Sequence, residues 1–242
     1  MANDTTNKPN HRQHKSLLIF DFDGTLIDSV PDLAAAINAM MTELGRAAYP
    51  IADIRNWVGN GSRLLVERAL VGDVEVGDKL TTTEADAAEE LFFECYAKQS
   101  GKETVAYANV DSGLKQLAEA GFTLALVTNK PIRFVPKILA SFGWDGLFAE
   151  VLGGDSLPSK KPDPAPLLHV CEQLTIAPEQ AVMIGDSKND ILAGQNAGMD
   201  TLALTYGYNY GQDIRDFAPT AAFDSFQNLV DFVLANYSVN RV

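Results

Sequence analysis

Five short apolar runs recur along this chain, and each of them ends at a polar residue or a glycine. They span residues 16–20, 122–127, 151–152, 181–184 and 201–204. Continuous apolar runs of this kind are typical of strands that are buried on both faces of a parallel sheet. A chain that contains several such strands must cover both faces of the sheet with helices.

Segments with helical periodicity separate most of these runs. They lie at residues 110–118, 132–142, 167–174 and 226–237. Gly121, Gly143 and Gly198 stand where the C-terminal caps of such helices are expected. Strands that alternate with helices predict βαβ units. The predicted fold class is therefore α/β, with a doubly wound, Rossmann-like parallel sheet.

The first two apolar runs are too far apart for a single crossover connection. Residues 29–105 have helical patterns and no convincing strand, so we expect a helical insertion there. Residues 1–15 are polar and are expected to form a disordered tail. The predicted organisation is a tail at 1–15, an α/β core at 16–28 and 106–242, and an inserted helical domain at 29–105.

The charge balance limits the partners that we expect. The chain has 32 acidic and 19 basic residues and a formal net charge of −13, which repels nucleic-acid phosphates and anionic lipids. No apolar run approaches the ~18 residues that a membrane span needs, and residues 1–15 contain no apolar secretion signal. We therefore expect a cytoplasmic protein without nucleic-acid or membrane partners, of unknown oligomeric state. Cys95 and Cys171 are expected to be core residues without a disulfide.

Polar residues gather where the apolar runs end. The clusters are Asp21 to Thr25, Thr128 to Lys130, Lys160 to Pro162, and Gly185 to Asp190. The carboxyl ends of parallel strands lie along one edge of a sheet, so we expect the four clusters to meet there. Asp21, Asp23 and Asp186 would then offer the hard oxygen ligands that Mg²⁺ prefers. Each residue alone also fits a turn, a helix cap or an exposed loop, but the four clusters together favour a magnesium site.

The four clusters, in this order, resemble the motifs of the haloacid dehalogenase-like hydrolases, a family made up mostly of phosphatases with an aspartate nucleophile. Residues 21–26, Asp-Phe-Asp-Gly-Thr-Leu, are similar to the first motif, Thr128 to the second, Lys161 to the third, and residues 185–190 to the fourth. The resemblance implies that the helical insertion at 29–105 is the family's cap. It also implies Mg²⁺ as the cofactor and a small phosphate ester as the substrate.

The resemblance assigns a role to each acidic residue of the motifs. It implies that Asp21 attacks phosphorus and forms an aspartyl-phosphate. It also implies that Asp23 protonates the leaving group and later deprotonates water. Asp21, the main-chain carbonyl of Asp23, and Asp186 would bind the metal. Asp190 would orient metal-bound waters or Lys161.

The phosphoryl group needs donors and positive charge, because a phosphate dianion repels a carboxylate nucleophile. The resemblance implies that Thr128 donates its hydroxyl, that Asn129 adds a main-chain N–H, and that Lys161 supplies charge. Gly24 would allow the backbone to approach the phosphate closely. Three further cations near the clusters are expected to attract an anionic substrate: Lys130, Lys160 and Lys188.

Other segments narrow the choice of substrate. Residues 57–61, 127–131 and 204–211 are similar to those of family members that hydrolyse 2-phosphoglycolate to glycolate and phosphate. Residues 107–110 read Tyr-Ala-Asn-Val where those members usually have Tyr-Pro-Gly-Val, which puts the geometry of the cap's return to the core in doubt. A phosphatase or phosphomutase acting on a sugar phosphate, a nucleotide or pyrophosphate uses the same motifs and is the alternative. A receiver-type domain that is phosphorylated on aspartate is more distant, because Asp23 and the long insertion disfavour it.

We expect the cap to select the substrate. Asn60 and Gly61 lie where a helix begins, and the N–H groups of a helix N-terminus favour an anion; a plain glycine turn is the alternative. Arg68 falls between Leu64 and Leu65 on the face of this helix, among apolar positions. An arginine there needs a partner, which is either a substrate carboxylate or an acidic residue of the chain. Asn60, Gly61 and Arg68 are therefore the predicted substrate-binding residues of the cap.

Overall fold

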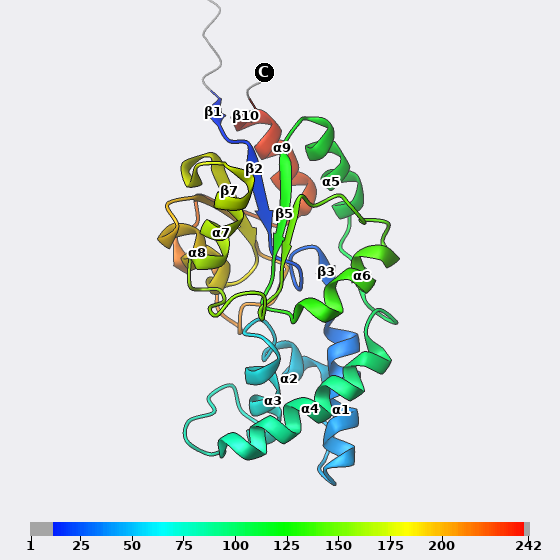
Figure 1. Ribbon diagram of the computed structural model, residues 1–242. Coiled ribbons are helices and arrows are strands. Elements are labelled where there is room, and N and C mark those ends of the chain that lie inside the picture. Colours follow the sequence, from blue (N-terminus) through cyan, green and yellow to red (C-terminus); the bar gives the residue numbers. More distant parts are fainter. Residues whose placement is uncertain (1–11, 240–242) are drawn as a thin grey trace, which may run out of the picture.

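The computed structural model describes residues 12–239, so the expected tail at 1–11 lies outside it. A six-stranded parallel sheet, in the order β6-β5-β2-β7-β8-β9, forms the centre of the larger part of the molecule (Figure 1). Its strands are β2 (Leu17–Phe20), β5 (Thr123–Val127), β6 (Glu150–Leu152), β7 (Ala181–Gly185), β8 (Asp200–Leu204) and β9 (Ala221–Phe223). The doubly wound α/β fold is confirmed. The sequence analysis missed β9, because this strand is short and only partly buried.

Successive residues of the strands face opposite sides of the sheet, as the period of a strand requires. Leu18 and Phe20 of β2 belong to one apolar core, and Leu17 and Ile19 belong to another. The helices on the first side are α5 (Val110–Glu119), α6 (Val135–Ser141) and α9 (Phe226–Asn236); those on the second are α7 (Ala165–Leu174) and α8 (Lys188–Asn196). The strands β2, β5 and β7 therefore each supply both cores at once.

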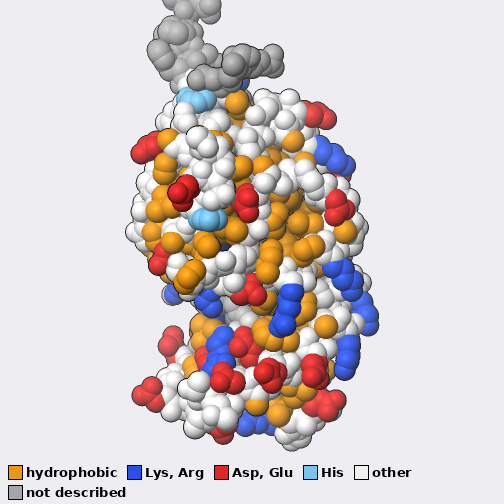
Figure 2. All heavy atoms as spheres, viewed as in Figure 1, with side chains coloured by type: hydrophobic (Ala, Val, Ile, Leu, Met, Phe, Trp, Pro, Cys, Tyr) orange, Lys and Arg blue, Asp and Glu red, His pale blue; other side chains and the backbone are white. Residues whose placement is uncertain are grey.

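Four further helices pack around an apolar core of their own, and we call this unit the cap. They are α1 (Val30–Glu43), α2 (Ile51–Arg55), α3 (Ser62–Val71) and α4 (Thr82–Gln99). α4 packs along both α1 and α3, and a capping box formed by Thr81 and Glu84 starts it. Figure 1 draws the cap below the sheet, and Figure 2 shows that the surface narrows between the two.

The cap joins the core through two short paired strands. β3 (Ile27–Asp28) and β4 (Val105–Ala106) run antiparallel, so the chain leaves the core and returns to it at neighbouring positions. The predicted domain boundaries fall at these strands and stay a prediction. After β4, Asn109 adopts a left-handed backbone with φ of 65°, which asparagine tolerates better than most residues. The unusual sequence of this return segment is therefore compatible with an ordered turn into α5.

The polar segment before the first apolar run is partly ordered. β1 (Gln13–His14) pairs in parallel with β10 (Tyr237–Ser238). Lys15 is buried, and its Nζ lies 3.0 Å from Oδ2 of Asp200. The prediction of a tail is therefore wrong for residues 12–15, because the C-terminal strand pairs with them and a carboxylate satisfies the lysine.

Both cysteines are buried and free. Cys95 packs in the core of the cap and Cys171 packs against the sheet, as the sequence predicted. None of the helices between residues 12 and 239 is long and apolar enough to cross a membrane.

Candidate active site

Three neighbouring strands bring the motif residues to one edge of the sheet. β2 pairs with β5 on one side and with β7 on the other. Asp21 directly follows β2, Thr128 follows β5 and Asp186 follows β7, while Lys161 comes from the loop between β6 and α7. The four clusters therefore meet at the carboxyl ends of the strands, which is where ligands bind in open parallel sheets.

Asp21, Asp186 and Asp190 form a buried acidic cluster. Carboxylate oxygens of the three residues lie within 4.8 Å of one another. The ammonium group of Lys161 lies 2.9 Å from Oδ1 of Asp21 and 2.6 Å from Oδ1 of Asp190. One positive charge therefore faces three carboxylates.

This excess of negative charge contributes to the raised pKa values of two carboxyl groups in the cluster. Burial raises the pKa of Asp21 to about 7, and the charge of Asp190 adds to this effect, while Lys161 opposes it. Burial also raises the pKa of Asp186 well above its usual value, and the charges of Asp190 and Asp21 act in the same direction. Buried carboxylate oxygens with uncompensated charge are the donors that a divalent cation such as Mg²⁺ prefers. The cluster therefore fits the cation that the sequence predicted.

Two of the three carboxylates are fixed by hydrogen bonds from the surrounding loops. Asp186 accepts a bond from the hydroxyl of Thr25 and one from the main-chain N–H of Tyr208, both at 2.6 Å. Oδ2 of Asp190 accepts bonds from the N–H and the hydroxyl of Ser187 and so caps α8. The other oxygen of Asp190 is left for Lys161. Asp190 therefore positions the lysine, which is one of the two roles expected for it.

Gly24 lies close to a carboxylate of the acidic cluster. Its φ is 90°, and a Cβ there would lie 2.2 Å from a carboxylate oxygen of Asp186. Gly207 approaches the same carboxylate as closely from the other side. The glycine in the first motif therefore allows the backbone to approach Asp186, and its expected approach to the phosphate stays a prediction.

Asp23 points away from the acidic cluster and toward Lys130. The Nζ atom of Lys130 donates to both carboxylate oxygens of Asp23, at 2.9 and 3.1 Å. The hydroxyl of Ser29 also donates to Asp23. Burial lowers the pKa of Lys130, but the charge and hydrogen bonds of Asp23 together with the adjacent Tyr96 outweigh this effect and raise the pKa above its usual value. Lys130 therefore stays charged although it is buried.

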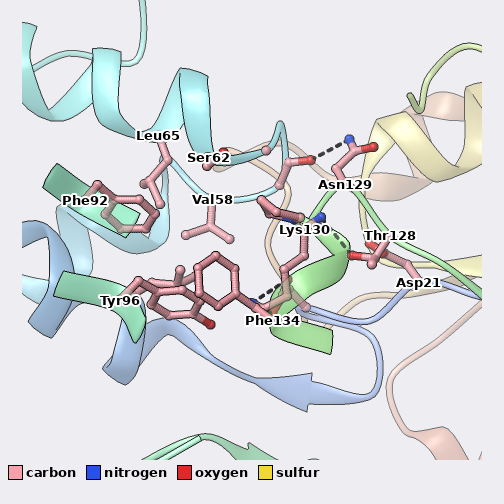
Figure 3. A pocket seen from close by; sticks show the side chains of 15 residues that line it. Asp21, Val58, Ser62, Leu65, Phe92, Tyr96, Thr128, Asn129, Lys130 and Phe134 are labelled. Atoms are coloured by element: carbon pink, nitrogen blue, oxygen red, sulfur yellow. Dashed lines mark hydrogen bonds and ion pairs between the residues drawn. The ribbon is translucent and has the colours of Figure 1, made fainter. Parts of the chain in front are cut away.

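A small cavity lies between the acidic residues and the cap (Figure 3). Its volume is about 40 Å³. The core lines it with Asp21, Asp23, Thr128, Asn129, Lys130, Pro131 and Phe134, and the cap lines it with Leu33, Val58, Gly59, Gly61, Ser62, Leu65, Phe92 and Tyr96. The cap wall is thus mostly apolar, while the polar groups come from the core.

The cap docks on the core through the main-chain oxygen of Gly59. This oxygen accepts hydrogen bonds from the side-chain amides of Asn129 and Asn189, both at 3.1 Å. The same amide of Asn129 also donates to the main-chain oxygen of Lys161. A Cβ on Gly59 would lie 2.5 Å from the hydroxyl of Tyr210. The sequence analysis missed Asn189, although it lies inside the fourth cluster, directly before Asp190.

Arg68 does not face the cavity, and neither does Asn60: the two are absent from the residues that line it. Arg68 is buried and donates to the main-chain oxygens of Trp57 and Val74, at 2.7 and 3.0 Å, and to Oδ1 of Asn60 at 3.0 Å. Among the described residues no acidic side chain forms an ion pair with this arginine, and carbonyl groups of the adjoining loops bind it instead. Of the three predicted cap residues, only Gly61 lines the cavity.

Comparison with known proteins identifies the class to which this fold and site belong. A family model described as haloacid dehalogenase-like hydrolase matches residues 18–204. The chain therefore belongs to the haloacid dehalogenase-like hydrolases and is an enzyme. The resemblance found in the motifs is thus confirmed, and the alternative of a receiver-type domain is excluded.

Named relatives are similar to nearly the whole chain. The phosphoglycolate phosphatase of Psychrobacter arcticus is 72% identical over 228 residues, which are 94% of this chain and 99% of that protein. The phosphoglycolate phosphatase of Colwellia psychrerythraea is 47% identical over 90% of this chain and 96% of its own length. Among solved structures, a predicted phosphoglycolate phosphatase from Haemophilus somnus is 38% identical in sequence and superimposes with a TM-score of 0.85. The match covers 91% of this chain and 99% of that chain.

Proposed function

We propose that this enzyme is a Mg²⁺-dependent phosphatase that hydrolyses 2-phosphoglycolate to glycolate and phosphate. The observation that carries the proposal is the cavity, which places Asp21 and Asp23 opposite an apolar cap wall. The similarity to relatives named phosphoglycolate phosphatase over almost their full length supports the substrate.

In the proposed mechanism, Asp21 is the nucleophile. Its carboxylate forms a bond to phosphorus while the bond from phosphorus to the glycolate oxygen breaks, which gives an aspartyl-phosphate. Lys161 lies 2.9 Å from Asp21 and offers positive charge beside the transferred group. The hydroxyl of Thr128 lines the same cavity and is placed to donate to a phosphoryl oxygen.

The cation would be held by the carboxylates of Asp21 and Asp186 and by the main-chain carbonyl of Asp23. When bound, it supplies charge neutralisation for the phosphate dianion. Asp190 does not need to contact it, because Asp190 is fully used by Lys161 and by the start of α8. The raised pKa of Asp21, about 7, is the physical reason why ionisation of the nucleophile calls for this additional positive charge.

Asp23 is the proposed acid and base. It donates a proton to the departing glycolate oxygen and then removes one from the water that attacks the aspartyl-phosphate. It lies two residues from Asp21 on the same loop and lines the same cavity. Asn129 supports the closed cap through its side chain, and its main-chain N–H remains the proposed phosphate donor.

The size of the cavity distinguishes the proposed substrate from the alternatives. Its volume of about 40 Å³ is a few times the ~10–15 Å³ that a single water occupies by the same measure. This room is closer to a leaving group of a few heavy atoms than to a hexose or a nucleoside.

A panel of phosphate esters, assayed with Mg²⁺, tests the proposal. We expect kcat/KM to be higher for 2-phosphoglycolate than for a hexose phosphate, a nucleoside monophosphate or pyrophosphate. A preference for any of the other three overturns the proposed substrate. Formation of an isomeric sugar phosphate in place of inorganic phosphate would identify a phosphomutase.

The expectations about partners and location stay predictions. We propose a small phosphate ester as the partner, an action in the cytoplasm, and no role for nucleic acids or membranes. The net charge of −13 supports this, because it disfavours binding to nucleic-acid phosphates and anionic lipids.

A further inference from the structure

The proposed substrate has a carboxylate in addition to its phosphate. Arg68, the partner expected for this carboxylate, does not line the cavity. The phosphate end must lie beside Asp21, where bond formation takes place. The carboxylate therefore points toward the cap. A residue that binds this carboxylate must line the cavity and offer positive charge or several hydrogen-bond donors. It must also be shielded from water, so that the interaction contributes to binding.

Lys130 is the only Lys, Arg or His among the residues that line the cavity. The side chains of the cap wall are mostly apolar, and the hydroxyl of Ser62 is already used as a donor to Glu89. Figure 3 shows the side chain of Lys130 in the middle of this region. The rings of Tyr96 and Phe134 lie on one side of it, and Thr128 and Asp21 lie on the other.

The contacts of Lys130 connect the core with the cap. Its ammonium group binds both oxygens of Asp23 and lies 5.0 Å from the centre of the Tyr96 ring on α4. The side chain of Lys130 is 3% exposed. A cation buried to this extent interacts strongly with an entering anion, because little water screens it.

We propose that Lys130 is the residue that recognises the carboxylate of the substrate, and that it does so by exchanging partners. This inference rests on the proposed function. In the structure described here, Lys130 donates to both oxygens of Asp23, so this pair must separate before Asp23 can carry a proton to the leaving-group oxygen. A substrate carboxylate that binds the ammonium group competes with Asp23 for it, and the released Asp23 takes a proton from water and passes it to the leaving-group oxygen.

The exchange makes substrate recognition and catalysis depend on one group. An ester with a carboxylate binds Lys130 and frees Asp23. A neutral ester of the same size, such as ethyl phosphate, leaves the pair of Lys130 and Asp23 intact, so it is both weakly bound and slowly turned over. Selection among small esters then appears in kcat as well as in KM.

The first test compares 2-phosphoglycolate with ethyl phosphate in Lys130→Met. We expect kcat/KM for 2-phosphoglycolate to fall at least about tenfold, the lower end for a hydrogen bond to a charged group. We expect a clearly smaller loss on ethyl phosphate, because this ester has no carboxylate to bind the ammonium group. Equal losses on both esters would assign Lys130 to structure and overturn the proposal. Lys130→Arg keeps the charge and should retain most of the preference.

Lys160→Met is the matched control. Lys160 is exposed, and its Nζ would lie 3.0 Å from a Cβ on Gly61, so it is a second cation close to the cavity but outside its lining. The ratio of kcat/KM for the two esters should stay at the wild-type value. If Lys160→Met abolishes the preference and Lys130→Met does not, the proposal is wrong.

A second measurement needs no turnover of 2-phosphoglycolate. 3-Phosphonopropionate and propylphosphonate are non-hydrolysable isosteres of the two esters, and each can be assayed as an inhibitor of ethyl phosphate hydrolysis. In the wild-type enzyme we expect an inhibition constant at least about tenfold lower for 3-phosphonopropionate, and in Lys130→Met nearly equal constants. Equal constants in the wild type overturn the proposal. A preference for 2-phosphoglycolate that survives in Lys130→Met overturns the inference alone, and the proposed function stands.

Discussion

The ammonium group of Lys161 lies 2.9 Å from Oδ1 of Asp21 and 2.6 Å from Oδ1 of Asp190. Asp190 is itself fixed at the start of α8, where its other oxygen accepts bonds from Ser187. The nucleophile proposed for this enzyme is thus approached by a cation that a helix terminus holds in place. Substitutions of Asp21 can therefore test the charge of this carboxylate separately from its contribution to the fold.

Asp21→Asn should remove turnover and leave the fold intact. The amide has the shape of the carboxylate but cannot form an acyl phosphate. We expect kcat to fall at least about a hundredfold, the lower end for a single catalytic group. Circular dichroism checks the fold, and Asp145→Asn, an exposed change on the core surface, is the control. A variant that retains more than about a hundredth of the wild-type kcat would mean that Asp21 is not the nucleophile.

Asp23→Asn should slow both formation and hydrolysis of the aspartyl-phosphate, because both steps need a proton carrier. Rapid-quench measurements with an ester that has a poor leaving group separate the two steps. We expect each rate to fall about a hundredfold or more. A normal burst followed by hydrolysis at the full rate would contradict the double role of Asp23.

Removal of divalent cations should abolish activity, and Mg²⁺ should restore it. Ca²⁺ should inhibit, because its larger radius and flexible coordination allow both oxygens of Asp21 to bind the metal and withdraw the nucleophile. Steady-state rates after treatment with a chelator, followed by titration with each cation, check this. Equal rates with Ca²⁺ and Mg²⁺ would contradict the proposed role of Asp21.

The metal-free protein should become less stable as the pH rises. The pKa of Asp21 is about 7 in the folded state and 3.8 without the fold. Between these values the folded chain therefore holds a proton that the unfolded chain has lost, and the free energy of unfolding falls with increasing pH. Asp186 acts in the same direction. Thermal unfolding from pH 4 to pH 8 should show a falling Tm that Mg²⁺ restores. Asp21→Asn should flatten the slope, and an unchanged slope in this variant would assign the effect to other groups.

Arg68→Ala should destabilise the cap and should not alter the choice of substrate. The change leaves the buried oxygen of Trp57 without its donor, which costs about 1–3 kcal/mol, and removes the donor to the partly exposed Val74. Tm should fall, and kcat/KM should decrease by the same factor for 2-phosphoglycolate and for ethyl phosphate. A larger loss on 2-phosphoglycolate alone would restore Arg68 as a selector. Arg63→Ala, which removes salt bridges of a partly exposed arginine on the same helix, is the control.

Periodicity and the polar ends of the strands were sufficient to predict the core of the fold. The run at 16–20 reads as a strand buried on both faces, and β2 supplies residues to the cores on both sides of the sheet. The three-residue β9 gives no such signal, since all of its residues are only partly buried. The order of residues 12–15 was also missed, because it depends on pairing with a strand more than two hundred residues away.

The candidate site shows the same limit at the level of single side chains. The position of Arg68 on an apolar face indicated that it needs a partner, but not that loop carbonyls would meet it. Lys130 was noted only as one of several nearby cations. Its role depends on which way the side chain turns from the end of β5, and that direction is set by Asp23 and the aromatic ring of Tyr96.

The pairing of β3 with β4 over two residues has an evolutionary consequence. Because Ile27 lies opposite Ala106, the ends of the cap are fixed side by side, and the chain passes between core and cap at two adjacent points. A unit joined in this way can be exchanged as a cassette without disturbing the strands that carry Asp21 and Asp186. Lys130 belongs to the core, so a recombined enzyme would inherit an anion receptor that its new cap does not encode. Exchanges of the cap would then change the accepted size of the leaving group before they change its preferred charge.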